Sequence, residues 1–223
     1  EHRFSLMSAG LSRLFVNETL VADNWTAQRP GDSFFGNGSD EVIGAVRLEM
    51  GAAATLTVEY SRRDSGAFAG LRIGMAPPTL TDDIDAACAL ASEADVAIVV
   101  VGLTSEWESE GHDRRDLELP GAQVELIRRV AWTNPNTVVV INAGAPIRTG
   151  DWLEAPRAVL QVWYPGQEFG NALADVLSGQ VNPSGRLPTT VPKRLQDNPT
   201  YTNYPGERGH VRYGEGIFVG YRY

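Results

Sequence analysis

The spacing of hydrophobic and polar positions changes part-way along the chain. Residues 1–74 alternate between the two kinds with period two and show no helical period. Alternation of this kind is typical of antiparallel strands, which pack one face on a core and expose the other to water. The first segment is therefore predicted to be all-β, with strands near residues 3–7, 12–16, 20–25, 41–50 and 53–60.

Short polar stretches interrupt this alternation and predict turns. Asn17-Glu18-Thr19 lies between two predicted strands, as in a β-hairpin. Gly51 separates the last two strands and is predicted to form a turn or a bulge. Residues 28–40 are rich in Gly, Ser, Asn and Pro, so they are predicted to form a loop.

After Pro77-Pro78, apolar strands alternate with helical patterns. Such alternation implies right-handed crossovers and a mostly parallel sheet flanked by helices, with both sheet faces covered. The predicted fold class is an α/β sandwich over residues 75–190, preceded by part of an antiparallel β-sandwich over 1–74 and followed by an extended tail over 191–223. Strands are expected at 95–101, 137–142 and 159–163, and helices after the N-cap Thr81 and at 121–132, 147–155 and 170–178, the last ended by Gly179.

Composition narrows the possible partners. The chain has 223 residues, of which 43% are hydrophobic, so it can bury a sizeable core. Its net charge of -9 argues against nucleic acid and anionic membranes as partners, because both attract basic surfaces. No apolar run reaches the roughly 18 residues of a membrane span. The single cysteine, Cys88, excludes an internal disulfide and is expected to be a small core residue rather than a nucleophile.

Candidate chemistry is concentrated in residues 106–114, directly after the predicted strand 95–101. The stretch reads Glu-Trp-Glu-Ser-Glu-Gly-His-Asp-Arg, and it is too polar for a core. In open α/β sheets, ligands bind at the loops that follow the carboxyl ends of strands. A salt-bridged surface loop is the alternative interpretation, because charge runs are usually solvated.

Several motifs follow one another in the second segment. They are Val99-Val100-Val101-Gly102-Leu103, Glu108-Ser109-Glu110-Gly111-His112-Asp113-Arg114, Leu117-Glu118-Leu119-Pro120-Gly121, Trp163-Tyr164-Pro165-Gly166-Gln167-Glu168-Phe169-Gly170, Ala172-Leu173-Ala174-Asp175-Val176-Leu177-Ser178-Gly179, Asn182-Pro183-Ser184-Gly185-Arg186-Leu187-Pro188 and the final Tyr213-Gly214-Glu215-Gly216-Ile217-Phe218-Val219-Gly220-Tyr221-Arg222-Tyr223. In this order, over residues 75–223, they resemble the second catalytic domain of glycoside hydrolase family 3, the β-glucosidases and their relatives.

The first segment carries a second likeness. Residues 8–18 (Ser-Ala-Gly-Leu-Ser-Arg-Leu-Phe-Val-Asn-Glu) and 21–24 (Val-Ala-Asp-Asn) resemble the second half of the β-sandwich domain of anthrax protective antigen. Many glycosidases and adhesins contain that domain. Its insertion just before this part of the second catalytic domain is a known arrangement in family 3, so the likeness implies that both segments belong to one enzyme.

The family resemblance implies a retaining exo-β-glycosidase, which uses two carboxyl groups about 5 Å apart. The family's nucleophile is an Asp on an N-terminal (β/α)8 barrel, so the chain is expected to act only with the barrel of the same enzyme. The acid/base is the Glu of the S-E-G-x-D-R pattern, which matches Glu110 here; Glu108 is the alternative. Trp107, Glu108 and His112 are candidates for binding the β-glucoside or oligosaccharide substrate. The alternatives are that Trp107 is a packing residue and that His112 is simply exposed to solvent.

Other residues are expected to have structural roles. Asp113 and Arg114 are predicted to pair and hold the loop, and Glu168 to cap the helix that begins near Gly170. Trp163 and Tyr164 are expected to pack rather than to stack on sugars. Asn17, Asn24 and Asn37 lie in N-x-S/T triplets, which matter only in a protein secreted by a eukaryote.

Two other functions compete with the glycosidase. A non-catalytic carbohydrate-binding or adhesion module is the main alternative, since it would also explain the sandwich and the exposed aromatic residues. A nucleotide-binding enzyme is disfavoured, because neither G-x-G-x-x-G nor G-x-x-x-x-G-K-S/T occurs. No metal or organic cofactor is implied, since the three histidines are not at ligand spacing.

Overall fold

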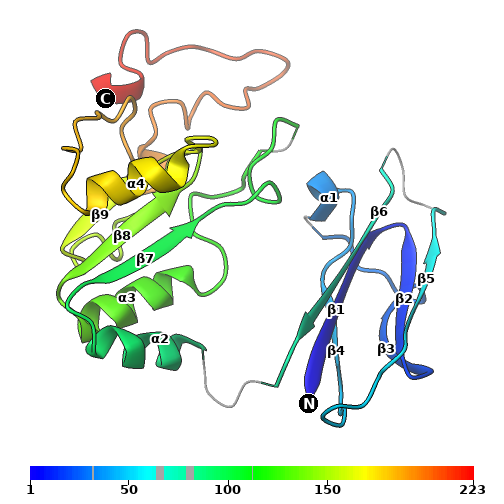
Figure 1. Ribbon diagram of the computed structural model, residues 1–223. Coiled ribbons are helices and arrows are strands. Elements are labelled where there is room, and N and C mark those ends of the chain that lie inside the picture. The colour runs from blue at the N-terminus through cyan, green and yellow to red at the C-terminus, as the bar shows by residue number, and fades with distance from the viewer. Residues whose placement is uncertain (32, 64–67, 79–82, 112) are drawn as a thin grey trace. The chain divides into compact units, whose positions relative to one another are not determined.

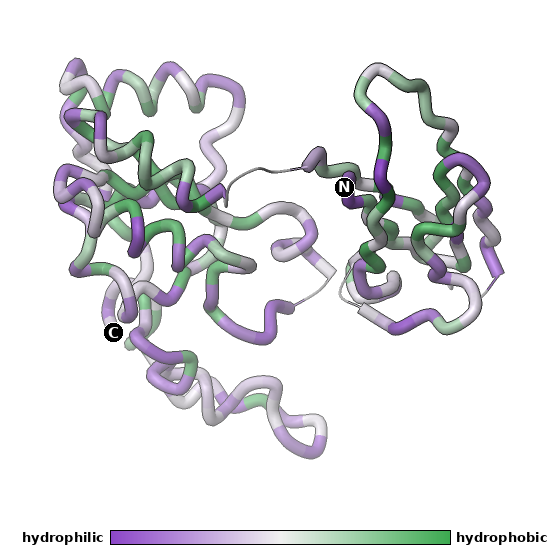
Figure 2. Tube along the Cα trace, turned by 90° about the horizontal axis from the view of Figure 1, so that it is seen from below, coloured by the Kyte–Doolittle hydropathy of each residue, from purple (hydrophilic) through white to green (hydrophobic). Residues whose placement is uncertain are grey.

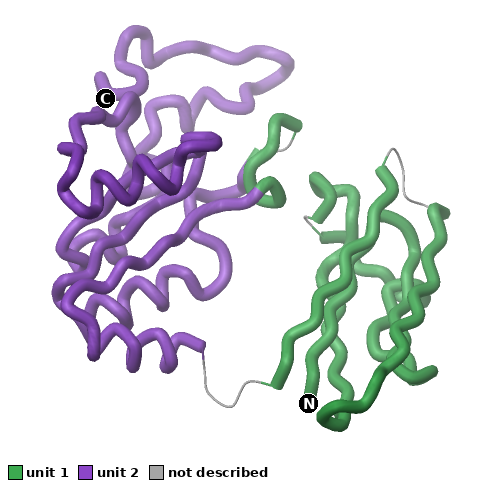
Figure 3. Tube along the Cα trace, viewed as in Figure 1, with its two compact units in different colours: residues 1–82, 105–113 green, residues 83–104, 114–223 purple. Residues whose placement is uncertain are grey.

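The computed structural model describes residues 1–31, 33–63, 68–78, 83–111 and 113–223. The chain divides into two compact units (Figure 3). Unit 1 comprises Glu1–Asp82 and Ser105–Asp113, and unit 2 comprises Asp83–Thr104 and Arg114–Tyr223. Apolar residues gather along the interior of each unit (Figure 2). The predicted N-cap Thr81 lies outside the described residues.

Unit 1 contains two three-stranded antiparallel sheets, ordered β4-β1-β6 and β3-β2-β5 (Figure 1). Phe4 and Leu6 of β1 share one hydrophobic core with Leu14 and Val16 of β2, so the two sheets pack on each other through alternate residues. The prediction of antiparallel strands is confirmed. The strands are β1 His2–Ala9, β2 Leu11–Val16, β3 Thr19–Asn24, β4 Val42–Val46, β5 Leu56–Ser61 and β6 Gly70–Ala76.

The predicted hairpin between β2 and β3 is confirmed. Asn17 and Glu18 have φ angles of 49° and 67°, the left-handed conformation that a two-residue type I′ turn requires. The side chain and backbone of Asn17 then fix the chain before β5. Its Oδ1 accepts a hydrogen bond from the N–H of Thr55 at 2.8 Å, and its own N–H donates to the Thr55 carbonyl at 2.9 Å.

β6 is a strand that the hydrophobic pattern did not indicate. It pairs with β1 over its whole length, yet it contains Gly70 and Gly74. A Cβ on Gly70 would lie 2.3 Å from the Phe34 ring, and one on Gly74 would lie 2.6 Å from Ser5 Oγ. These close approaches exclude side chains and so remove the alternation on which the prediction depends.

The loop predicted at residues 28–40 contains one short helical turn, α1 Ser33–Gly36. Phe34 and Phe35 have φ angles of 51° and 59°, so the turn is left-handed. The turn is stabilised by backbone hydrogen bonds from the N–H groups of Asn37 and Gly38.

Unit 2 contains a three-stranded parallel sheet in the order β7-β8-β9, formed by Ala97–Gly102, Thr137–Asn142 and Ala158–Gln161. Helices α2, Asp83–Ser92, and α3, Gln123–Thr133, lie on one face, and α4, Phe169–Leu177, lies on the other (Figure 1). The predicted parallel sheet with flanking helices is confirmed. Residues 178–223, all of them described, form only two short 3-10 helices, η1 Leu195–Asp197 and η2 Gly220–Arg222.

The core of unit 2 lies between the sheet and the pair α2 and α3. Val99 and Val101 of β7 are buried there with Ile127 of α3. On the opposite face of β7, Ile98 and Val100 are 52% and 56% exposed. The expectation that both faces of this strand are covered is therefore wrong within this chain, because α4 does not extend over β7.

The helix predicted at residues 147–155 is also wrong. This stretch forms successive turns, in which the N–H groups of Trp152 and Leu153 both donate to the Thr149 carbonyl. Pro156 disfavours helical geometry in the residue before it. Ile147 and Trp152, each 2% exposed, instead anchor the stretch in the core of unit 2.

Candidate functional site

The charged loop follows β7 at the carboxyl end of the parallel sheet, where the sequence predicted it. Glu110 is exposed, and Glu108 is half-buried. Trp107 is 44% exposed, so it is not a core residue. His112 lies outside the described residues. An exposed carboxyl group on a loop is free to meet a group that another domain presents.

Glu106 forms an ion pair with Arg72 of β6 within unit 1. The guanidinium of Arg72 also lies over the ring of Phe34, 5.8 Å from its centroid. A cation held over an aromatic face and beside a carboxylate is fixed by both. Glu106 therefore has a structural role in this loop, whose other acids are Glu108, Glu110 and Asp113.

Arg114 ends the loop, and backbone groups orient it. Its Nη2 donates to the Glu118 carbonyl at 2.9 Å, and its Nη1 donates to the Pro146 carbonyl at 3.4 Å. The predicted ion pair with Asp113 is wrong, since the described structure gives the guanidinium these carbonyl acceptors instead. Arg114 thus ties the end of the loop to the chain that follows β8.

The segment after Arg114 is held by a second arginine. The guanidinium of Arg148 pairs with the Glu118 carboxylate and with Asp151, 2.6 Å away. Hydrogen bonds to these two carboxylates raise the pKa of Arg148 above its usual value. Its backbone N–H also donates to the Leu117 carbonyl at 2.7 Å. The polypeptide on the C-terminal side of the loop therefore has a fixed course.

The start of the loop is held by a residue that the sequence pattern did not single out. The N–H of Gly102 donates to Gln123 Oε1 at 2.7 Å, and Gln123 Nε2 donates back to the Gly102 carbonyl at 3.1 Å. Gln123 comes two residues after the quoted motif that ends at Gly121. The sequence signal that could have indicated its role is a polar residue two positions after the glycine of a turn.

The aromatic residues after β9 have different positions. The hydroxyl of Tyr164 donates to the Leu103 carbonyl at 3.1 Å, although the residue is 51% exposed. Trp163 has a φ of 57°, an uncommon conformation for a bulky residue. It lines an apolar groove of about 750 Å³ beside Phe169 and Leu187. None of the described residues that line this groove is an acid, so it does not provide the carboxyl pair of a glycosidase.

Glu168 immediately precedes α4 and has a local role. Its carboxylate accepts a hydrogen bond from Asn171 Nδ2 at 2.8 Å, and its carbonyl accepts one from the N–H of Ala172 at 3.0 Å. The side chain makes no capping bond to the backbone of the helix. It supports the first turn through Asn171 rather than as a side-chain cap.

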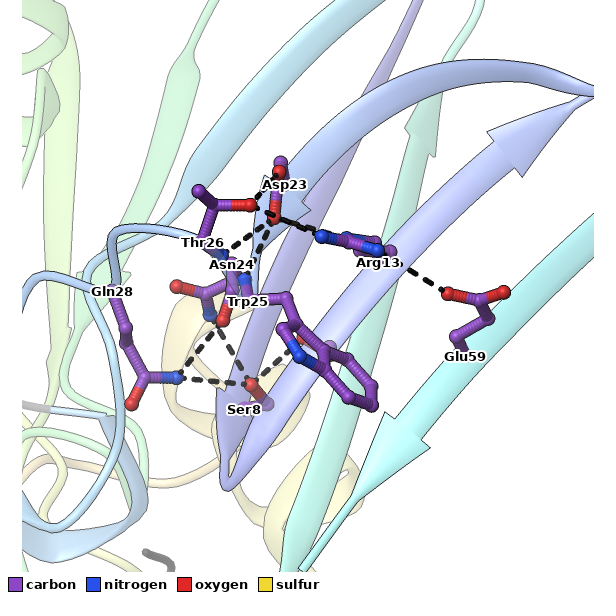
Figure 4. A network of polar contacts seen from close by, with 9 residues as sticks. Ser8, Arg13, Asp23, Asn24, Trp25, Thr26, Gln28 and Glu59 are labelled. Atoms are coloured by element: carbon purple, nitrogen blue, oxygen red, sulfur yellow. Dashed lines mark hydrogen bonds and ion pairs between the residues drawn. The ribbon is translucent and has the colours of Figure 1, made fainter. Parts of the chain in front are cut away.

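A second polar cluster lies in unit 1 (Figure 4). Asp23 accepts hydrogen bonds from the N–H groups of Trp25 and Thr26 and from the Thr26 hydroxyl. Arg13 pairs with Asp23 and stacks over the Trp25 ring at 5.4 Å. These contacts close the turn after β3. The cluster is therefore a structural element of the turn.

Beside it, a set of buried hydroxyl and amide groups joins the two sheets. Asn24 is fully buried, and its Nδ2 donates to Ser8 Oγ at 3.2 Å and also to Ser39 Oγ. Ser8 Oγ lies 2.8 Å from Ser12 Oγ. The burial of Asn24 leaves no room for a glycan, whereas Asn17 and Asn37 are exposed.

Two further observations concern the described part of the chain. No cluster of three or more His, Cys, Asp or Glu side chains there is arranged to hold a metal ion. No helix there has the length and apolar character needed to cross a membrane. Cys88 is half-buried and packs against the core of unit 2, as expected for a small core residue.

Comparison with known proteins decides the family. Residues 12–221 match the glycosyl hydrolase family 3 C-terminal domain. The chain belongs to this family. The resemblance inferred from the motifs of the second segment is confirmed, and the matched residues include the whole loop from Glu106 to Arg114.

Relatives of this family 3 chain carry related names. A beta-glucosidase from Rhizobium radiobacter is 48% identical over 100% of the chain, and a probable beta-glucosidase I from Emericella nidulans is 43% identical over 99% of it. The solved beta-glucosidase of Kluyveromyces marxianus in complex with glucose matches 100% of the chain with a TM-score of 0.86 and 42% identity. A beta-glucosidase structure from Bifidobacterium adolescentis, with a TM-score of 0.59 and 46% identity, covers 63% of the chain and 21% of that protein.

The chain is much shorter than these relatives. It spans 28% of the length of the Rhizobium radiobacter protein and 27% of the Kluyveromyces marxianus one. The remaining length of those proteins has no counterpart among the residues described above.

Proposed function

We propose that this family 3 chain supplies the general acid/base, Glu110, to a retaining exo-β-glycosidase of the β-glucosidase type. The nucleophile of that enzyme is an Asp on a barrel domain outside these residues. The observation that carries the proposal is the family match over residues 12–221, which includes the Ser-Glu-Gly-His-Asp-Arg loop. The names of the relatives support a glucoside as the substrate.

The chemistry assigned to Glu110 has two steps. Its carboxyl group first donates a proton to the glycosidic oxygen while the bond from this oxygen to the anomeric carbon breaks. The barrel Asp simultaneously forms an ester with the anomeric carbon. The Glu110 carboxylate then takes a proton from a water molecule, whose oxygen displaces the Asp and releases the sugar with its original configuration.

The geometry of the loop supports this role. Glu110 is exposed, as a group must be if it is to reach a glycosidic bond held by another domain. At the neighbouring Gly111, a Cβ would meet no atom within 4 Å, so the loop is uncrowded beside the acid. Glu106 pairs with Arg72. Trp107, Glu108 and His112 lie near Glu110 in the sequence and are proposed to contact the sugar.

The two units are proposed to have different origins. We assign residues 1–74 to the second half of an inserted protective-antigen-type β-sandwich, residues 75–190 to the α/β domain and residues 191–223 to an extended tail. The shared core of the two antiparallel sheets supports the first assignment. The 63% coverage by the Bifidobacterium adolescentis structure also supports an insertion, because part of the chain has no match in that relative.

The test compares Glu110→Gln with the wild type in the complete enzyme, meaning this chain together with its barrel domain. Two substrates are used: methyl β-glucoside, whose leaving group needs protonation, and 2,4-dinitrophenyl β-glucoside, whose leaving group does not. Glu110→Gln should lower kcat/KM for the methyl glucoside about 10²- to 10⁴-fold and largely spare kcat/KM for the dinitrophenyl glucoside. Without its base, hydrolysis of the glycosyl-enzyme should limit kcat for the dinitrophenyl glucoside, and azide, a nucleophile that needs no base, should raise this kcat.

Glu108→Gln is the matched control, because it lies two residues away on the same loop. A larger loss of methyl glucoside hydrolysis in Glu108→Gln than in Glu110→Gln would transfer the role to Glu108. Unchanged hydrolysis in Glu110→Gln would reject acid/base catalysis by this residue. Sugar binding by a complete enzyme that hydrolyses neither substrate would favour the carbohydrate-binding module instead.

A further inference from the structure

We propose that Gln123 is a positioning residue: it fixes the point at which the loop of Glu110 leaves the sheet, and acid catalysis by Glu110 depends on that contact. The inference rests on the proposed function of Glu110. Gln123 itself does not touch the reacting atoms, because both polar atoms of its carboxamide are engaged by the backbone.

The Gln123 carboxamide pairs with both polar groups of one residue. Gly102 donates its N–H to Oε1 at 2.7 Å and accepts from Nε2 at 3.1 Å. The other hydrogen of Nε2 serves the carbonyl of Pro120, also at 3.1 Å. Among neutral side chains, only Asn and Gln combine a carbonyl acceptor with two N–H donors in this way. The carboxamide therefore has no hydrogen left to donate to a ligand.

This pairing occupies the position beside β7 that a neighbouring strand would take. β7 is the end strand in the order β7-β8-β9, so one edge of it has no partner strand among the described residues. The next N–H, that of Leu103, donates toward β8 to the Asn142 carbonyl at 3.1 Å. In a strand, the N–H and C=O of one residue point to one edge, and those of the next residue point to the other. The groups of Gly102 therefore face the unpaired edge, where Gln123 takes the place of a strand.

Steric fit makes this junction rigid. A Cβ on Gly102 would lie 1.9 Å from the Asn142 carbonyl oxygen, so the two strands approach here more closely than a side chain allows. Leu103 is 5% exposed, and its carbonyl accepts the Tyr164 hydroxyl at 3.1 Å. Both polar backbone groups of Gly102 and of Leu103 are thus hydrogen-bonded just before the loop begins.

The residue that holds this junction is itself well anchored. Gln123 is the first residue of α3, and the helix buries Ile127 and Val130, at 0% and 3% exposure, in the core of unit 2. Gly121 has a φ of 63°, which directs the chain from Pro120 into the helix. The Leu-Pro-Gly-Ala-Gln sequence therefore places a hydrogen-bonding side chain on a packed helix beside the edge of β7.

Loss of the pairing should act on Glu110 through the chain. Only seven positions separate Leu103 from Glu110. A displacement of about 1 Å in a catalytic group can lower its rate contribution about 10²-fold. An isosteric side chain without polar atoms should therefore weaken proton donation while leaving the fold and the sugar contacts largely in place.

The experiment uses Gln123→Met in the complete enzyme with the two substrates named above. We expect kcat/KM for methyl β-glucoside to fall about tenfold and kcat/KM for the dinitrophenyl glucoside to change less than about twofold. Gln123→Glu keeps the acceptor for Gly102 but sets a carboxylate oxygen against the Gly102 and Pro120 carbonyls, so it should also give a leaving-group-dependent loss. Gln123→Glu also tests the inference if Gln123→Met does not fold.

Gln161→Met is the matched control, because Gln161, at the carboxyl end of β9, also donates from Nε2 to a backbone carbonyl, that of Ala143 at 2.8 Å. It should show no leaving-group dependence. Equal losses on both substrates in Gln123→Met and Gln123→Glu, or no loss in either, would overturn the inference. Glu110→Gln in the same assay separates the two hypotheses: if it lacks leaving-group dependence, the proposed function fails, whereas a normal Glu110→Gln result with unselective Gln123 variants rejects Gln123 alone.

Discussion

Asn134 donates a hydrogen bond from Nδ2 to the carbonyl oxygen of Ala91, 3.0 Å away. The same amino group donates to the Ala94 carbonyl at 2.8 Å, and Oδ1 accepts from the N–H of Asn136 at 2.9 Å. Asn134 is the C-cap of α3, and Ala91 lies in the last turn of α2. One side chain therefore ties together the ends of the two helices on this face of the sheet.

We expect Asn134→Ala to lower the free energy of unfolding by about 2 kcal/mol. Asn134 is only 6% exposed, so its replacement removes buried hydrogen bonds to the Ala91 and Ala94 carbonyls. Urea denaturation followed by tryptophan fluorescence measures the change. Asn136→Ala is the control, because Asn136 is exposed and donates to Asp95 at 3.3 Å; its cost should stay below about 0.5 kcal/mol. The reverse order of the two costs would contradict this prediction.

Two glycines should respond to alanine in opposite ways. Gly102→Ala would place a Cβ 1.9 Å from a backbone oxygen of Asn142, so we expect it to destabilise the protein by about 3 kcal/mol or to prevent folding. Gly170 lies in α4, where a methyl group in place of its hydrogen would meet no atom within 4 Å, and Gly170→Ala should stabilise by about 0.5–1 kcal/mol. Thermal unfolding of both variants tests the pair. Similar unfolding temperatures would show that strand spacing at Gly102 adapts.

The elements that the sequence predicted best are those whose burial is regular. β8 was expected at residues 137–142 and forms there, because a short apolar stretch bounded by a turn and a polar residue is buried on both sides. β6 was missed, because its glycines lie in close contact with Phe34 and Ser5, which are distant in sequence. The helix predicted at 147–155 was wrong, because Ile147 and Trp152 anchor this stretch in the core as a series of turns.

In the candidate site, too, the sequence predicted the features that depend on local residues and missed those that depend on distant ones. The loop of Glu110 was found from its composition and its family pattern, both of which are local. Gln123 was not, because its role depends on a contact with Gly102 that spans 21 positions and is created only by folding. The partner of Arg114 was assigned to its neighbour Asp113, whereas the fold brings two carbonyl groups within its reach.

Stability in acid should depend on Asp23. Burial alone raises the pKa of this carboxyl, but hydrogen bonds from the Thr26 hydroxyl and from the N–H groups of Thr26 and Trp25, with the charge of Arg13, bring it from 3.8 to about 2. A lowered pKa in the folded state stabilises the protein above pH 4 to 5, by an amount on the order of 2 kcal/mol. This contribution is lost as the pH falls through about 2.

Asp23→Asn removes this titration, so the stability difference between wild type and variant should shrink by about 2 kcal/mol from pH 5 to pH 2. Unfolding free energies from urea titrations at several pH values give the difference directly. Thr26→Val, which removes the hydroxyl donor 2.7 Å from Asp23, should reduce the same slope only in part. A difference that does not change with pH would mean that Asp23 titrates alike in the folded and unfolded states.

Arg114 provides the last prediction, since it holds the C-terminal side of the loop of Glu110. Arg114→Met removes the donors to the Glu118 and Pro146 carbonyls, so limited proteolysis should cut residues 105–118 several-fold faster, with fragments identified by mass spectrometry. Arg114→Lys should be intermediate, because a single ammonium lacks the planar fork that spans two acceptors. Arg115→Met changes the exposed residue next to it and controls for the loss of a cationic cleavage site. Equal cutting rates in Arg114→Met and Arg115→Met would show that the guanidinium bonds do not restrain the loop.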